Sequence, residues 1–260
     1  MTTNQTQSNF KQLQKNVMKK TLYRLVYDIS IVIFLILITT HHMEIKNYTF
    51  KRMTRFWTMW GCWTTLLYFV LVSIKQIMKL KKQLSFFFSS KTIDNKNENI
   101  QNSENIKLFD KIIDYLNQSS IAISISVSLL FWMLYIKSPS SVLRRSKDFH
   151  QSFMEEMFVT HFEHSFPLLF LLIDCLIFKQ GNKHTQKLYS IAKYVPMIFY
   201  SGYSYIALYD FFTQRIRPYP FMDKWELNQI LMLMVCIACI LFFGLNRIAY
   251  FLRKSLRKVF

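Results

Sequence analysis

The chain has 260 residues, of which 52% are hydrophobic and 17% aromatic, with only 4 glycines and 5 prolines. These values argue against an ordinary soluble domain, and the apolar residues come in long blocks, which indicates membrane spans. The net charge of +18 would suggest nucleic-acid binding in a soluble protein. Here the cations lie between apolar blocks and no basic-aromatic binding module accompanies them. We therefore expect membrane lipids as partners and no nucleic acid.

Six apolar blocks follow a polar, basic N-terminal extension at residues 1–22 and precede a basic tail at 253–260. A helix needs about 20 apolar residues to cross a bilayer, so residues 23–252 are predicted to form an all-α, integral membrane bundle of six helices. The fifth of them is expected to bend at Pro196. The predicted spans are about 23–40, 56–74, 119–136, 158–178, 188–212 and 227–250.

A long connection, basic at first and then rich in asparagine, separates the second and third spans at residues 75–117. Its segment 91–106 has the composition of a disordered region. The third span carries many Ser and Ala residues, whose small side chains allow close packing of membrane helices.

The distribution of Lys and Arg predicts the orientation in the membrane. Six spans place both termini on one side, and most of the Lys and Arg residues lie on that side, in the N-terminal segment, the 75–111 and 179–187 connections and the tail. Cytoplasmic segments are usually the richer in these residues. Both termini are thus expected in the cytosol or the mitochondrial matrix, with the mitochondrial inner membrane and an endomembrane both left open.

The fourth predicted span contains ionisable residues, which are costly inside a membrane and are candidates for function. His161 and His164 lie three residues apart, so on an α-helix they share a face. Thr58, in the first turn of the second span, has a similar predicted depth. A hydroxyl and an imidazole at matched depth are the minimum for base-assisted nucleophilic attack. The alternative for Thr58 is a hydrogen bond to the carbonyl one turn back.

Two aspartates are candidate partners of His164. Asp174 follows it by ten residues and therefore lies about 15 Å along the helix, which is too far to orient the imidazole. Asp210, near the outer end of the fifth span, is a supporting candidate, with a plain interfacial carboxylate as the alternative.

Other motifs favour structure over chemistry. Trp57, Trp60 and Trp63 suit an interfacial aromatic belt that anchors the second span. Two histidines without a defined carboxylate motif are a weak metal signal, so neither a metal nor a cofactor is expected. The candidate metal ligands in this region are His150, Glu156, His161 and His164.

Four segments together resemble the androgen-induced and androgen-dependent (TFPI-regulating) membrane proteins. Residues 55–60 (Arg-Phe-Trp-Thr-Met-Trp) are similar to that family's aromatic-rich motif around a threonine. Residues 161–164 (His-Phe-Glu-His) match its His-x-x-His motif. Residues 171–174 (Leu-Leu-Ile-Asp) and 219–221 (Tyr-Pro-Phe) agree in order and spacing. The family consists of multi-pass hydrolases of fatty acid esters of hydroxy fatty acids.

The resemblance implies that Thr58 is the nucleophile and His164 the general base, with His161 and Tyr219 in support. It implies a fatty-acyl ester as substrate. Thr160 and the early Pro167 depart from the family pattern, and the basic extensions are longer than usual. The alternative is a non-catalytic accessory subunit of a large membrane assembly, such as a respiratory complex of the mitochondrial inner membrane, that retains the hydrolase fold.

Overall fold

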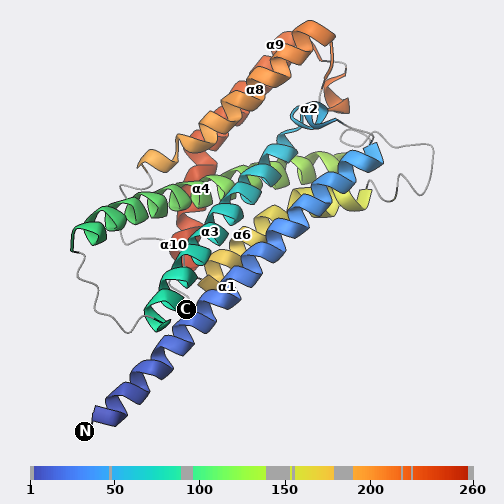
Figure 1. Ribbon diagram of the computed structural model, residues 1–260. Coiled ribbons are helices and arrows are strands. Elements are labelled where there is room, and N and C mark those ends of the chain that lie inside the picture. Colours follow the sequence, from blue (N-terminus) through green and yellow to red (C-terminus); the bar gives the residue numbers. More distant parts are fainter. Residues whose placement is uncertain are drawn as a thin grey trace.

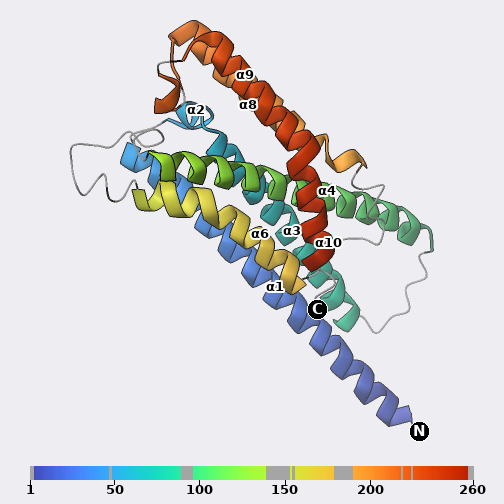
Figure 2. The same ribbon diagram turned by 180° about the vertical axis from the view of Figure 1, so that it is seen from behind.

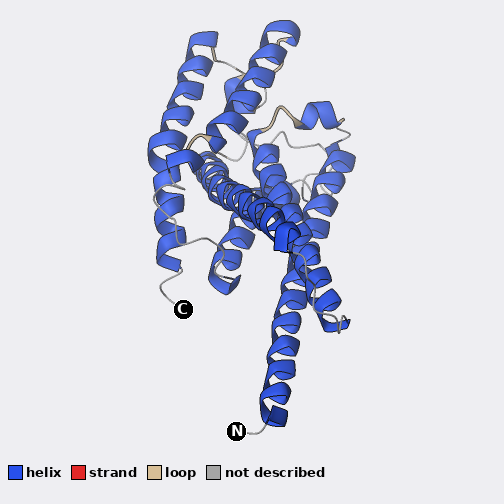
Figure 3. Cartoon of the chain, turned by 60° about the vertical axis from the view of Figure 1, so that its left-hand side comes forward, coloured by secondary structure: helices blue, strands red, loops and turns tan. Residues whose placement is uncertain are grey.

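The computed structural model describes residues 3–46, 49–88, 96–138, 153, 156–178, 190–217, 219–223 and 225–256. Within these residues all regular structure is helical (Figure 3), which confirms the predicted all-α membrane bundle. The α-helices are α1 (Thr3–Lys46), α2 (Phe50–Met53), α3 (Trp57–Phe88), α4 (Lys96–Lys137), α6 (His164–Phe178), α8 (Val195–Gln214), α9 (Leu227–Cys239) and α10 (Asn246–Leu256). Shorter elements are the π-helical turns η2 (Glu156–Glu163) and η4 (Ile240–Leu245) and the 3₁₀ turn η3 (Pro220–Met222).

Five segments of the described chain are long and apolar enough to cross a membrane. Helix α8 has 20 residues, the length of a sixth span, but its four tyrosines make it more polar than the others. The five segments are Lys15–Glu44, Trp57–Ser85, Leu108–Lys137, His161–Phe178 and Leu227–Leu256, of which the last runs through α9, η4 and α10.

Helices α1, α3, α4 and α6 pack into one group, while α8 and α9 form a hairpin that extends beyond it (Figure 1). Helix α10 returns along α4 toward the group, and both termini lie toward the same end of the molecule (Figure 2). The first turns of α1 project past the other helices at that end. The starts of α3 and α6 lie toward the opposite end.

Small residues let α3 and α4 approach closely, as the Ser-rich third span predicts. A Cβ atom on Gly61 would lie only 3.2 Å from the Cγ2 atom of Val127 on α4. The Ser120 hydroxyl donates to the Thr64 carbonyl across the same contact, at 3.0 Å. Without a side chain at Gly61 and with short polar ones on α4, the backbones come into contact and hydrogen-bond.

The structure refines two expectations about the connections. Segment 91–106 is not disordered throughout, because α4 begins at Lys96 and is helical from there. The bend expected at Pro196 is a break: the helix is interrupted at Lys193 and Tyr194, and α8 begins anew at Val195. Proline lacks an N–H group and therefore fits the first turn of a new helix.

Candidate functional site

Thr58 and His164 meet at the starts of α3 and α6. The Thr58 Oγ1 atom lies 3.0 Å from the His164 Nε2 atom, within hydrogen-bond distance. Both side chains are buried, with 6% and 4% of their surface exposed. The structure thus brings together the hydroxyl and the imidazole that the sequence placed at matched depth.

The π-helical turn η2 and Pro167 set the position of His164. Because Pro167 has no N–H, the Glu163 carbonyl loses its usual donor one turn later. The Cys62 thiol of α3 donates to that carbonyl instead, at 3.6 Å. On the other side, the Ser128 hydroxyl of α4 donates to the His164 carbonyl. The junction between η2 and α6 is therefore held from two neighbouring helices.

His161 does not share the buried face of His164, contrary to the α-helical prediction. It lies in η2 and is exposed, and its ring centroid is 6.1 Å from that of Trp132. A π-helix bonds each carbonyl to the fifth residue along rather than the fourth, so a spacing of three no longer brings side chains to one side.

A cavity of about 20 Å³ opens beside the Thr58 and His164 side chains. That volume is enough for about one water molecule. Four wall residues come from α4 at intervals of three and four, which places them on one apolar face. The cavity is lined by Trp57, Thr58, Val127, Leu130, Phe131, Leu134, His164, Tyr219 and Phe221.

Tyr219 reaches the same cavity from the segment after α8. Its hydroxyl oxygen accepts the backbone N–H of Trp57 at 3.0 Å and also forms a hydrogen bond with Thr58. Burial of the hydroxyl raises the pKa of Tyr219, although hydrogen bonds from Thr58 and Trp57 oppose this rise. The phenol therefore carries its proton at neutral pH.

Asp210 pairs with Arg55 rather than serving as the orienting partner of His164. The Arg55 Nε atom lies 2.5 Å from a carboxylate oxygen of Asp210, and a terminal nitrogen of Arg55 donates to Gln214 at 2.9 Å. Both charged residues are buried. This pair ties the C-terminal end of α8 to the turn before Thr58. The sequence analysis assigned Arg55 no partner and therefore did not predict the pair.

Sequence reasoning also missed a second buried pair near the site. The His42 Nδ1 atom of α1 lies 2.5 Å from a carboxylate oxygen of Glu163, and Glu163 is 1% exposed. Since Glu163 immediately precedes His164, this contact fixes α1 against the junction that presents the imidazole. The available signal was a histidine and a glutamate at the ends of two predicted spans.

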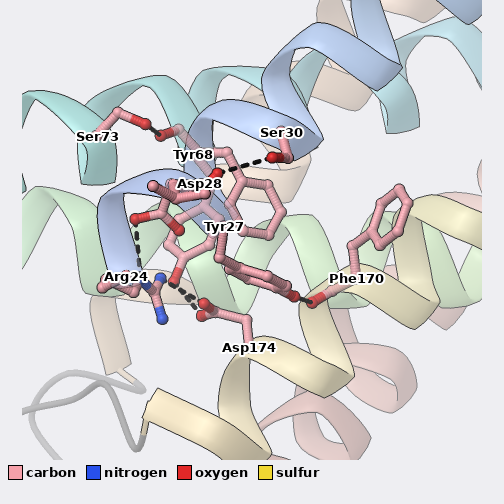
Figure 4. A network of polar contacts seen from close by, with 10 residues as sticks. Arg24, Tyr27, Asp28, Ser30, Tyr68, Ser73, Phe170 and Asp174 are labelled. Carbon is pink, nitrogen blue, oxygen red and sulfur yellow. Dashed lines mark hydrogen bonds and ion pairs between the residues drawn. The ribbon is translucent and has the colours of Figure 1, made fainter. Parts of the chain in front are cut away.

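A third cluster, the Arg24 network, lies about 15 Å deeper along α3 and α6 (Figure 4). Arg24 forms ion pairs with Asp28, at 2.9 Å, and with Asp174. The Tyr68 hydroxyl donates to Asp174 at 2.5 Å. Arg24 thus pairs with carboxylates of α1 and α6, and α3 joins through Tyr68, as expected when charges inside a membrane pair with one another. The sequence had correctly separated Asp174 from His164 but had assigned it no partner.

Trp57 is not part of an interfacial belt. It is 3% exposed, its Nε1–H donates to the Ser126 hydroxyl at 2.9 Å, and its ring packs against Tyr200 and Tyr203. Among the residues that the structure describes, no group of three or more His, Cys, Asp or Glu side chains could hold a metal ion. His150 lies outside the described residues.

Comparison with known families identifies the chain. The model of the FAR-17a/AIG1-like protein family matches residues 21–254. The chain belongs to this family. It is the androgen-induced family that the sequence motifs resemble, and the match includes most or all of each of the five apolar segments described above. Neither the search of curated proteins nor the search of solved structures returned a match.

Proposed function

We propose that this protein hydrolyses a lipid ester in the membrane, with Thr58 as nucleophile and His164 as general base. The observation that carries the proposal is the 3.0 Å contact between Thr58 Oγ1 and His164 Nε2 beside a cavity. Family membership supports the same reading through the activity that the resemblance implies. The substrate class we propose is a fatty-acyl ester, in particular a fatty acid ester of a hydroxy fatty acid.

The chemistry uses the tautomer of His164 that carries its proton on Nδ1, so that Nε2 accepts the Thr58 proton. As Oγ1 bonds to the substrate carbonyl carbon, the C=O electron pair moves onto the carbonyl oxygen. The tetrahedral intermediate then expels the alcohol, which takes the proton from Nε2. Water, activated by the same imidazole, releases the fatty acid from acyl-Thr58 and restores the hydroxyl.

The cavity walls fit an apolar substrate. Val127, Leu130, Phe131 and Leu134 offer one hydrophobic face of α4 to the reacting pair, as in ligand sites that have few polar groups. The present volume of about 20 Å³ admits water but not an acyl chain. Substrate entry therefore requires the side chains of this face to move apart.

Purified full-length protein in lipid nanodiscs, given a chromogenic acyl ester and a hydroxyl-directed fluorophosphonate probe, tests the proposal. Thr58→Ala and His164→Gln are expected to abolish both turnover and labelling at residue 58. Thr65→Ala is the matched control, because Thr65 is equally buried on α3 but bonds to the Gly61 carbonyl and Ser124. Turnover that survives Thr58→Ala would rule out the proposed nucleophile.

A second candidate function is an accessory subunit of a larger membrane assembly, in the mitochondrial inner membrane or an endomembrane. The observation favouring it is the start of α1, which projects beyond the bundle (Figure 1) with Leu13 and Val17 exposed. Native gel electrophoresis of a variant lacking residues 1–20 tests this role. Loss of a high-molecular-mass band would support the subunit role, and an unchanged band would contradict it.

We further propose that both termini face the cytosol or matrix, because most Lys and Arg residues lie on their side. Cysteines substituted at Ser85 and Asp223, both exposed and near opposite ends of the bundle, can be probed with an impermeant thiol reagent. Labelling of only Asp223→Cys from the outside is the expected result.

A further inference from the structure

Two aromatic contacts hold the Tyr219 side chain in position. It lies between α8 and η3, and its ring stacks on Phe221 with an interplanar angle of 17°. The same ring and that of Phe56 form a T-shaped contact, with ring centroids 5.8 Å apart. These contacts hold the phenolic hydroxyl at the first turn of α3, beside Thr58 and His164 in the cavity wall.

The start of α3 polarises that hydroxyl. The first N–H groups of an α-helix have no partner within the helix, and the helix dipole makes this end positive. The Trp57 N–H donates to the Tyr219 oxygen at 3.0 Å. With the oxygen accepting this bond, the phenolic proton remains to be donated, and the adjacent positive end makes it a stronger donor.

The geometry points to Tyr219 as the oxyanion donor of the esterase reaction, a role that rests on the proposed function of Thr58 and His164. The Tyr219 oxygen accepts hydrogen bonds from the backbone N–H groups of Trp57 and Thr58, and the oxyanion forms on the carbon that bonds to Thr58 Oγ1. As the C=O electron pair moves onto the carbonyl oxygen, the Tyr219 O–H donates a hydrogen bond to that oxygen. No proton is transferred, so the phenol is unchanged when the intermediate collapses.

A purely structural role predicts different kinetics. A hydroxyl that only caps α3 would affect stability and leave the rate per folded molecule unchanged. A donor that acts in the transition state lowers kcat when removed, because its bond strengthens only as charge develops on the substrate oxygen. Loss of one such donor typically lowers kcat by about 10²–10³-fold.

The test compares Tyr219→Phe with wild type and with Tyr200→Phe in nanodiscs, using the same acyl ester. Tyr200 is the matched control, since its ring packs on Trp57 while its hydroxyl donates to the Met234 carbonyl at 2.8 Å, away from the cavity. We expect Tyr219→Phe to lower kcat by about 10²–10³-fold, with KM changed less than about threefold. Tyr200→Phe should keep kcat within about threefold of wild type.

Incorporation of 3,5-difluorotyrosine at position 219 provides a second measurement, including where Tyr219→Phe fails to accumulate. This side chain keeps the donor but is more acidic, so kcat should return to within about tenfold of wild type and depend on phenol acidity. A kcat that is unchanged in Tyr219→Phe, or that falls as far with the fluorinated side chain as expected for Tyr219→Phe, would overturn the donor role alone. If wild-type protein shows no turnover, or turnover that persists in His164→Gln, the esterase function itself is overturned.

Discussion

Helices α3 and α6 contact each other at two levels, here called the upper and the lower meeting, and the residues in contact differ in chemistry. At the upper one, Thr58 contacts His164; ten residues further along each helix, Tyr68 donates to Asp174. The upper contact joins a hydroxyl to an imidazole beside a cavity. The lower contact belongs to the Arg24 network, in which charged groups of α1 and α6 pair with one another and Tyr68 joins them from α3.

The difference shows that a buried ionisable residue in a membrane bundle is not by itself a catalytic site. Asp174 is 0% exposed and has an arginine and a tyrosine as partners, which is the arrangement of a structural clamp. Thr58 and His164 instead place a hydroxyl and an imidazole beside a cavity with room for about one water molecule. The convergence of polar atoms on a cavity, rather than the presence of charge, therefore distinguishes the candidate active site.

The largest expected effect is on catalysis at the upper meeting. His164→Gln should lower the rate of ester cleavage by about 10³-fold or more, because it removes the base that acts together with Thr58. The thermal midpoint should change little, since glutamine retains a polar group at that position. The rate on an acyl ester and the melting curve are measured on the same nanodisc sample. A rate within about tenfold of wild type would contradict the view that the upper contact, unlike the lower one, takes part in catalysis.

The next largest effect is on stability at the lower meeting. Arg24→Met leaves Asp28 and Asp174 without their shared cation and should lower the free energy of unfolding by about 3–5 kcal/mol. Cleavage per folded molecule should remain near that of wild type. Denaturation in mixed micelles gives the stability, and active-site titration with the probe gives the folded fraction.

Lys75→Met is the control for Arg24→Met. Lys75 pairs with Asp110 at 2.7 Å, but about a third of each side chain is exposed, so its loss should cost less than about 1 kcal/mol. Equal losses in the two variants would contradict the view that the Arg24 network acts as a buried clamp.

A smaller, mixed effect is expected at the pair that supports the upper meeting from α1. Glu163→Leu deprives His42 of its 2.5 Å contact and should destabilise the protein by about 1–3 kcal/mol. Because Glu163 adjoins His164, the rate should also fall, by about tenfold. Glu163→Gln keeps an acceptor for His42 and should recover most of both. Stability loss without a rate change would assign the pair to the fold alone.

The smallest effect concerns the close contact of α3 with α4 between the two meetings. Gly61→Ala places a Cβ atom 3.2 Å from Val127 Cγ2, so a steric cost of about 1–3 kcal/mol opposes the gain of about 1 kcal/mol in helix propensity. A net loss of about 1 kcal/mol is expected, and Val127→Ala should offset it in the double variant. A stabilised Gly61→Ala variant would show that the helices separate easily here.

The sequence by itself determined the all-α membrane class, the family, and the pairing of Thr58 with His164 at one depth. Block length gives the spans, because a helix must be about 20 residues long to cross the bilayer. Depth along a helix follows from the rise of 1.5 Å per residue. Residue counting therefore places two side chains at the same level without any knowledge of the fold.

Only the tertiary structure decided which side chains at one level face each other. A helix that is apolar all round carries no stripe to show its rotation about its own axis, so the partners of Arg24, Arg55 and His42 were not readable. The π-helical turn η2, which separates His161 from His164, depends in the same way on neighbours in space, since Cys62 and Ser128 hold its junction with α6. These contacts join residues far apart in the sequence, and local patterns do not record them.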